Sequence, residues 1–200
     1  MGPLCARCAA SMAAPTRVCG KVTDHGPPVY ALADYSGPAR RAVLAYKERG
    51  RRELAGVLGG LLAAALPRLP ELTPGRAPLL VPVPSRPAGA RVRGGQHMLR
   101  VASRCAARLS ERGRPAAVYP VLRMDRRARD SAGLGAAERM ANLAGRLRCV
   151  ASVPARGPVV LLDDVVTTGA TAAACCAELA RAGLTVTAIL ACTATGSRWS

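Results

Sequence analysis

The sequence predicts an α/β fold in which helices flank a mainly parallel sheet of about five strands. A small cysteine-containing appendage is expected over residues 1–28, and the domain itself over residues 29–200. Segments typical of strands alternate with segments typical of helices along this domain. One of them, at residues 159–162, is a continuous aliphatic run, as expected of a parallel strand that is buried on both faces. The chain has 200 residues, of which 50% are hydrophobic, and this suffices for one such domain and its core.

The expected elements follow one another in a regular order. Ser36 is placed to cap the first helix, which Gly50 ends, and Gly183 is placed to end the last helix. Pro82 and Pro84 end a strand, because proline cannot donate to a sheet ladder. The expected strands are 30–35, 79–81, 118–122, 159–162 and 185–192, the expected helices are 36–50, 53–66, 94–109 and one that ends at 181, and segment 142–150 is expected to be helix and then strand.

Two adjacent carboxylates follow the aliphatic run of residues 159–162. Asp163 and Asp164 stand where that strand is expected to end, and the loop of residues 165–171 leads into an alanine-rich helix. Ligands of open α/β sheets collect at the carboxyl ends of the strands. Successive backbone N–H groups in such a loop, together with the helix N-terminus, can hold a phosphate. Because adjacent acids suit vicinal hydroxyls, the stretch predicts a site for a ribose 5-phosphate.

This stretch resembles the phosphoribosyl-pyrophosphate (PRPP) motif of type I phosphoribosyltransferases. The resemblance implies the fold of that family, PRPP or another ribose 5-phosphate as ligand, and Mg²⁺ carried by PRPP. The two acids would hold the ribose 2- and 3-hydroxyls, and the loop would wrap the 5-phosphate. The alternative is a chance strand–turn–helix with an ordinary N-cap, which would leave two adjacent acids without a compensating ligand. The matched residues are Asp163, Asp164, Val165, Val166, Thr167, Thr168, Gly169, Ala170 and Thr171.

A proline-rich segment at the end of an earlier strand is the second constellation. Type I phosphoribosyltransferases place their pyrophosphate loop at this point of the fold. Arg91 and Arg93 follow closely and can offer forked donors to phosphate oxygens. The alternative is a proline-rich turn with solvated arginines. The resemblance assigns the pyrophosphate loop to Val83, Pro84, Ser85 and Arg86.

The order of further matches over residues 5–195 is similar to that in ComF-like proteins, phosphoribosyltransferase-fold relatives linked to DNA uptake in competent bacteria. This resemblance leaves several functions open: transfer of a phosphoribosyl group to a nitrogen nucleophile with release of pyrophosphate, a non-catalytic accessory of DNA uptake that binds single-stranded DNA, or a PRPP sensor. Gly95 stands where that family usually has an aromatic residue, and residues 129–134 lack its usual glutamine, so the acceptor is not carried over. The matched residues are Tyr35, Gly37, Lys47, Gly50, residues 81–84, Arg93, Gly94, Gln96, Arg123, Arg139 and Asn142.

A basic connection in the second half of the chain matches the hood over the active site of type I enzymes. Closing a lid shields displacement at the anomeric carbon from water, and arginines in it can help to neutralise the leaving pyrophosphate. The alternative is a solvated charged loop. No general base is assigned, because neither His25 nor His97 stands at a revealing position in the motifs. The lid candidates are Arg123, Arg126, Arg127, Arg129 and Arg139.

The N-terminal segment carries part of a zinc-binding pattern. Cys5 and Cys8 have the spacing of half a zinc knuckle, and Cys19 follows them. ComF-like proteins often carry two such cysteine pairs at this place. Tetrahedral Zn²⁺ needs four ligands, but Val22 occupies the expected fourth position, so His25 is the only obvious substitute. The segment is therefore either a Zn²⁺ site or a degenerate finger.

The chain is strongly basic, with a formal net charge of +17. Such a chain attracts polyanions by counterion release, and both DNA and PRPP qualify, so charge alone does not separate the functions. No segment reaches the roughly 18–20 apolar residues needed to span a bilayer, and no hydrophobic region of a signal peptide is present. We therefore expect no membrane insertion and a cytoplasmic location, and we leave open whether the chain forms a homo-oligomer.

Overall fold

A mostly parallel sheet with helices on both faces forms the domain, as the sequence predicted. The sheet has six strands in the order β1-β2-β8-β7-β3-β4, and every neighbouring pair is parallel except β1 and β2. The computed structural model describes residues 4, 6–12, 14–19, 26–85, 95–125, 146–151 and 157–196. The strands of this sheet are β1 (Thr16–Arg17), β2 (Val29–Ala31), β3 (Leu79–Pro82), β4 (Ala117–Val118), β7 (Val159–Val166) and β8 (Val186–Ala194).

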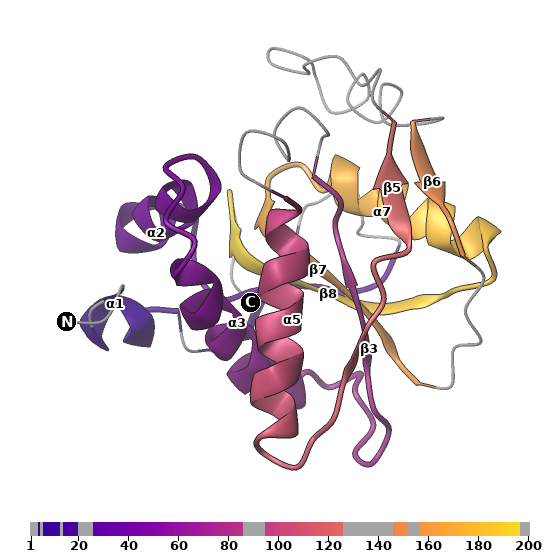
Figure 1. The fold of residues 1–200 in the computed structure, drawn as a ribbon, viewed down its shortest axis with the longest axis horizontal. Coiled ribbons are helices and arrows are strands. Elements are labelled where there is room, and N and C mark those ends of the chain that lie inside the picture. Colours follow the sequence, from indigo (N-terminus) through magenta and orange to yellow (C-terminus); the bar gives the residue numbers. More distant parts are fainter. Residues whose placement is uncertain are drawn as a thin grey trace.

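The helices divide between the two faces of this sheet. α3 and α5 lie together on one face, and α7 lies on the other (Figure 1). α5 is amphipathic, because its buried residues recur with the helical period at Met98, Val101, Cys105 and Leu109. The helices are α1 (Ala6–Ala10), α2 (Gly37–Lys47), α3 (Leu54–Ala65), α5 (His97–Ser110) and α7 (Ala170–Arg181), with a 3₁₀ turn η1 (Leu66–Arg68) after α3.

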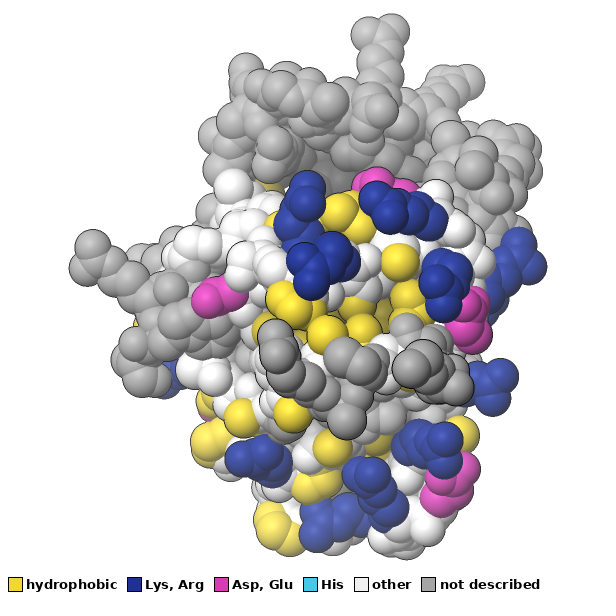
Figure 2. All heavy atoms as spheres, turned by 90° about the vertical axis from the view of Figure 1, so that its left-hand side faces the viewer, with side chains coloured by type: hydrophobic (Ala, Val, Ile, Leu, Met, Phe, Trp, Pro, Cys, Tyr) yellow, Lys and Arg dark blue, Asp and Glu magenta, His cyan; other side chains and the backbone are white. Residues whose placement is uncertain are grey.

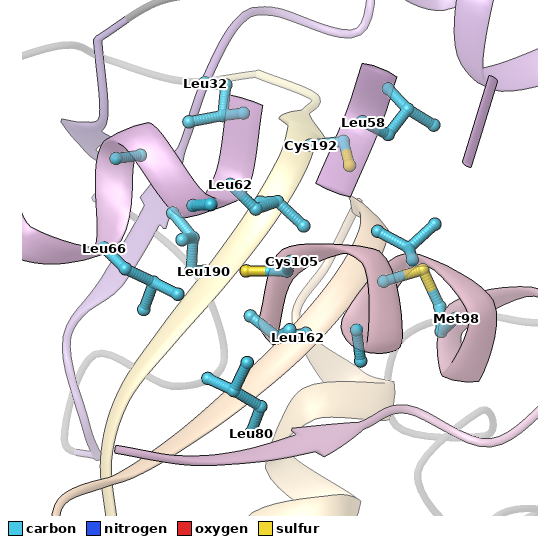
Figure 3. Close-up of a cluster of buried hydrophobic side chains, with 14 of the residues drawn as sticks. Leu32, Leu58, Leu62, Leu66, Leu80, Met98, Cys105, Leu162, Leu190 and Cys192 are labelled. Atoms are coloured by element: carbon cyan, nitrogen blue, oxygen red, sulfur yellow. The ribbon is translucent and has the colours of Figure 1, made fainter. Parts of the chain in front are cut away.

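The core on the α3/α5 face is built from leucine and sulfur-containing side chains (Figure 3). Leu162 of β7 is fully buried there between side chains of both helices and the neighbouring strands. α3 and α5 approach closely at Gly59, where an added Cβ would stand 2.7 Å from the Cβ of Arg104 and 2.8 Å from the N of Cys105. Close packing at this glycine fixes α5, and with it the start of that helix, relative to the strand ends.

The opposite face is covered by α7 and by a second, two-stranded sheet. This sheet pairs β5 (Leu122–Met124) with β6 (Leu147–Cys149) in antiparallel orientation. The single strand predicted for residues 118–122 is therefore wrong, because that segment is divided between β4 and β5. Pro120 lies between them, and a residue without an N–H group cannot continue a ladder.

The described part of the N-terminal segment is integrated into the domain. Met12 is completely buried in the α3/α5 core, and β1 extends the sheet beyond β2 as an antiparallel edge strand. The N–H of Val18 donates to the carbonyl oxygen of Val29 over 2.8 Å. β2 is shorter than the strand predicted for residues 30–35, and beyond its end only Asp34 rejoins the sheet, as a bridge to Ala194.

Candidate functional site

The carboxyl ends of β3 and β7 lie side by side. Pro82 is in parallel register with Leu162, and the N–H of Val83 donates to the carbonyl oxygen of Leu162 over 2.9 Å. The loop after β3 and the end of β7, which the sequence singled out separately, therefore meet at one edge of the sheet. This is the edge at which open parallel sheets bind their ligands. Of the predicted pyrophosphate loop, Val83, Pro84 and Ser85 are at this edge, and Arg86 lies outside the described residues.

β7 does not end at Leu162, as the sequence predicted, but continues through both acids to Val166. Asp163 is paired with Ala191 of β8, so the hydrogen-bond ladder runs on after the apolar pattern has stopped. Successive side chains of a strand point to opposite faces of the sheet. The two carboxylates are therefore not a side-by-side pair at an open strand end. Both residues are buried, with 6% of Asp163 and 4% of Asp164 exposed.

Asp164 lies on the α3/α5 face, where two cationic or hydrogen-bonding partners reach one of its oxygens. The Nζ of Lys47, at the end of α2, is 2.7 Å from Asp164 Oδ2, and the Nε2 of His97, at the start of α5, is 2.9 Å from the same oxygen. The other oxygen accepts the N–H of Val165 over 2.8 Å. Burial by itself raises the pKa of this carboxyl, but the hydrogen bond from His97 and the charge of Lys47 outweigh it and hold the pKa below its usual range. Asp164 is therefore an anion.

Asp163 has the opposite electrostatic character on the α7 face. Burial raises the pKa of its carboxyl far above the usual range, and the charge of Asp164 raises it further. Its Oδ1 accepts the N–H of Asp164 over 2.8 Å. The nearby thiol of Cys175, in α7, is itself fully buried, and its pKa is raised by burial and by Asp163. The two neighbours in sequence thus form one neutral and one ionised carboxyl.

The turn between β7 and α7 contains a glycine in the left-handed conformation. Gly169 has φ 81° and ψ −4°, a left-handed conformation that favours glycine, and α7 begins directly after it. The first turn of a helix leaves its N–H groups without partners inside the helix. One of them, that of Ala170, is directed at Oγ1 of Thr168 over 3.4 Å. Thr167 is exposed, whereas Thr168 and Thr171 are half-buried.

His97 connects the two segments of this edge, and sequence reasoning missed it. Its Nδ1 is 2.5 Å from Oγ of Ser85 in the loop after β3, while its Nε2 reaches Asp164 in β7. The side chain of Gln96 accepts the N–H of Ser85 over 2.6 Å, so the start of α5 holds that loop twice. Ser85 and His97 are 4% and 6% exposed.

A signal for His97 was present in the sequence. It precedes Val101 and Cys105 by four and eight residues, so helical spacing puts it on the buried face of α5. A titratable side chain on such a face needs a polar partner. The partners are on β3 and β7, so sequence spacing could not name them. Lys47 was matched to the family but was given no role.

Of the arginines proposed as phosphate contacts or lid residues, the structure describes only Arg123. Its Nη1 donates to the carbonyl oxygen of Pro120 over 2.9 Å, and it lines a small pocket of about 10 Å³ together with Val83, Pro84 and Gln96. Arg123 therefore lies beside the loop after β3. The other predicted arginines, Arg86, Arg91, Arg93, Arg126, Arg127, Arg129 and Arg139, lie outside the described residues.

The predicted metal ligands are described only in part. Cys8 and Cys19 form no disulfide with another described cysteine, while Cys5 and His25 lie outside the described residues. Within the described ranges no group of three or more His, Cys, Asp and Glu side chains could hold a metal ion. The acids of β7 do not fit direct coordination of Mg²⁺, because Asp164 is already bound by Lys47 and His97 and Asp163 favours its protonated form.

No protein-family model matches this chain, and no curated protein matches it. None of the helices in the described residues is long and apolar enough to cross a membrane.

Proposed function

We propose that this chain is a cytoplasmic, PRPP-binding protein of the phosphoribosyltransferase type, related to the ComF-like proteins. The 5-phosphate of the ligand binds at the turn of residues 165–171, and its pyrophosphate lies at the loop of residues 83–85. The observation that carries the proposal is the meeting of these two segments at the carboxyl edge of a parallel sheet, held together by the bond from Val83 to Leu162.

The proposed binding of the 5-phosphate has the strongest support. Gly169 leads directly into α7, whose N-terminal N–H groups and dipole favour an anion. The first turn of α7 contains no acidic residue that would repel a phosphate. Thr167 is exposed and Thr168 half-buried in the turn before α7, and threonine hydroxyls can donate to phosphate oxygens.

The proposed contacts to the ribose hydroxyls have less support, because both acids of the motif are buried and they lie on opposite faces of the sheet. Asp164 is held by Lys47 and His97, so we assign it a structural and electrostatic role. Asp163 is the acid that we propose for the ribose hydroxyls, since a neutral carboxyl can both donate to and accept from a hydroxyl. In a transfer reaction the bond between C1 of the ribose and pyrophosphate breaks, and a bond from C1 to a nitrogen nucleophile forms.

Calorimetric titration tests the binding site. Mg-PRPP, ribose 5-phosphate and Mg-pyrophosphate are titrated into the wild type, Gly169→Ala and Thr168→Val. We expect both variants to weaken PRPP and ribose 5-phosphate at least tenfold and pyrophosphate little, because the changes are confined to the 5-phosphate turn. Thr73→Val is the matched control, since Thr73 is exposed in the loop that precedes β3, away from the carboxyl edge. If the wild type binds none of the three ligands, the proposal is wrong.

Turnover needs a separate measurement. Release of pyrophosphate from PRPP is followed in the presence of purine, pyrimidine and other nitrogen acceptors. Release with one acceptor identifies a phosphoribosyltransferase. Tight PRPP binding without release for any acceptor would instead identify a PRPP sensor.

Binding of single-stranded DNA is the second candidate, and a row of arginines on α5 favours it. Arg100, Arg104 and Arg108 recur every four residues, and Arg112 continues the spacing just beyond the helix. Residues four apart lie about 6 Å apart along one face of a helix. Lys and Arg side chains also outnumber acidic ones on the face shown in Figure 2. Such a row can contact successive phosphates of a nucleic-acid strand without stacking its bases.

Salt dependence separates this candidate from the first. A single-stranded oligonucleotide is titrated at several salt concentrations into the wild type and into the triple variant Arg104→Gln/Arg108→Gln/Arg112→Gln. We expect the slope of log affinity against log salt to fall by about two to three units if the row binds phosphates. The control triple variant Arg49→Gln/Arg52→Gln/Arg148→Gln removes the same charge from exposed positions outside α5. Equal slopes for both triple variants would remove the row as a specific site.

A further inference from the structure

A chain of polar contacts runs through the buried edge of the domain, from α2 to the loop after β3. The Nζ of Lys47 contacts Oδ2 of Asp164 over 2.7 Å, and the Nε2 of His97 contacts the same oxygen over 2.9 Å. The Nδ1 of His97 is 2.5 Å from Oγ of Ser85. His97 thus contacts both Ser85 and Asp164, and each of its two ring nitrogens has a different partner.

In the neutral state of His97 the direction of each hydrogen bond is fixed. Asp164 is ionised and can only accept, so Nε2 carries the proton and donates to it. Nδ1 then has only a lone pair, and the hydroxyl of Ser85 must donate to it. The oxygen of Ser85 is left with lone pairs alone, and these repel an anion.

In the protonated state the second bond reverses. Nδ1 now donates to the oxygen of Ser85, because both nitrogens of an imidazolium are donors. The hydroxyl hydrogen of Ser85 is released and can donate to another acceptor. The bond to Asp164 is kept and now joins two charged groups. The same serine therefore repels an oxyanion in one state and binds it in the other, with no movement of the backbone.

We propose that His97 is a positioning residue that takes up a proton when a phosphate or pyrophosphate oxyanion binds to the hydroxyl of Ser85. The inference rests on the proposed function, since that function brings pyrophosphate to the loop of residues 83–85. It adds that ligand binding and protonation are linked, and that Ser85 contacts the anion as a hydrogen-bond donor.

Several charged and polar groups surround the ring of His97. Asp164 of β7 accepts from it directly, and Asp163, the next acid, favours its neutral form. Lys47 of α2 opposes the charge but is bound to the same carboxylate oxygen. Three further groups of the described residues lie near the ring. Tyr46 donates to the backbone carbonyl of His97 over 2.7 Å, Arg100 lies beside Tyr46, and the thiol of Cys192 in β8 is buried, with its pKa raised by burial and by Asp164.

Nuclear magnetic resonance measures the protonation and tautomeric state of the His97 ring directly. The chain has two histidines, so the variant His25→Asn leaves a single imidazole to observe. Long-range ¹H–¹⁵N spectra distinguish the two neutral tautomers from the imidazolium. Near pH 7.5 we expect the Nε2–H tautomer in the free protein and the imidazolium when Mg-pyrophosphate saturates it. The same neutral tautomer in both states would overturn the inference.

Calorimetry measures how many protons the protein takes up when the ligand binds. Mg-pyrophosphate is titrated in two buffers of different ionisation enthalpy, with the wild type, His97→Gln and Ser85→Ala. Because the ligand's own protonation is common to all three, the difference between wild type and variant belongs to the protein. We expect the wild type to take up as much as one proton more than either variant when Mg-pyrophosphate binds. Its affinity for this ligand should fall by up to about tenfold per pH unit at pH values at which the free ring is neutral. Both variants lose this additional uptake, and Ser85→Ala binds about three- to tenfold more weakly.

The outcomes separate this inference from the proposed function. If the wild type binds neither PRPP nor pyrophosphate, the proposed function is wrong, and the inference with it. If it binds them with the same proton uptake as Ser85→Ala, the proposed function stands and the inference is wrong. Should His97→Gln fail to fold, Ser85→Ala carries the test, because it keeps the contact between His97 and Asp164.

Discussion

Asp163 and Asp164 are neighbours in the chain, yet their surroundings are opposite. Asp164 faces α5 and α2, where Lys47 and His97 hold its pKa below the usual range. Asp163 faces α7, where burial and the charge of Asp164 raise its pKa. A strand that is buried on both faces can therefore carry one ionised and one neutral acid in succession, because the sheet between them separates the partners available to each.

This difference shows why a motif of adjacent acids cannot be treated as one functional group. Their mutual repulsion is lowered when one of them keeps its proton. The cations gather on the α3/α5 face, so the charge remains with Asp164. We expect substitutions to act differently on the two faces for the same reason.

The largest effect is expected for Asp164→Asn. This change removes the charged hydrogen-bond acceptor of a nearly buried histidine and the counterion of a lysine that is 35% exposed. Breaking a buried pair costs about 3–5 kcal/mol, and the exposure of Lys47 reduces the expected loss to about 2–3 kcal/mol. Urea unfolding at neutral pH measures it. Asp163→Asn is the matched control and should lose no stability, because asparagine resembles a protonated aspartate and removes the ionisation that favours the unfolded state above pH 3.8. Equal losses would refute the assignment of the charge to Asp164.

The next effect concerns the helix pair that positions His97. Gly59→Ala should destabilise the fold by about 1–3 kcal/mol, because its Cβ would meet backbone and Cβ atoms of α5 at less than 3.0 Å. Gly56→Ala, in the same helix but with nothing within 4 Å of the added Cβ, should stabilise it by about 0.5–1 kcal/mol. Thermal unfolding of the two variants compares them. Opposite signs are the expected result, and a neutral Gly59→Ala would show that α5 can shift.

A smaller effect concerns how the free energy of unfolding depends on pH. The two acids should change this dependence in opposite senses. The folded protein keeps a proton on Asp163 at pH values above the ordinary pKa of 3.8. The unfolded state binds fewer protons there, so the free energy of unfolding falls as the pH rises from 3.8 to the raised pKa of about 8. Asp164 acts in the opposite sense, since its lowered pKa makes stability fall as the pH drops below 3.8. Urea unfolding between pH 4 and 8 should give a flatter profile for Asp163→Asn than for the wild type. Parallel profiles would contradict the raised pKa of Asp163.

The smallest effect is chemical and tests whether both faces exclude water. Burial raises the pKa of Cys105, on the α5 face, to about 12 and raises that of Cys175, on the α7 face, as well. Because the thiolate is the reactive form, neither should be alkylated by iodoacetamide in the native protein, whereas the exposed Cys19 should be. Peptide mass spectrometry reads the sites. Modification of Cys105 before Cys175 would show that the α5 face opens more readily.

Several elements could be predicted because their signals are local. The period of Met98, Val101, Cys105 and Leu109 indicates α5, and the glycine at position 169 marks the turn before α7. The class of fold also follows from the alternation of elements, and the mostly parallel sheet confirms it. Boundaries were less accurate. β7 is longer than its apolar run, since its last residues are held by the ladder with β8 rather than by their own hydrophobicity.

The amino-acid sequence by itself determined the α/β class, the helical turn after the two acids and the supply of polar groups at the ends of β3 and β7. Only the tertiary structure decided that the acids face opposite sides, that Lys47 and His97 converge on one of them, and that His97 also contacts Ser85. The physical reason is that periodicity reports the face of an element but not the partner across it. The partners of Asp164 in α2 and α5 are brought to it by packing between segments that lie far apart in the chain.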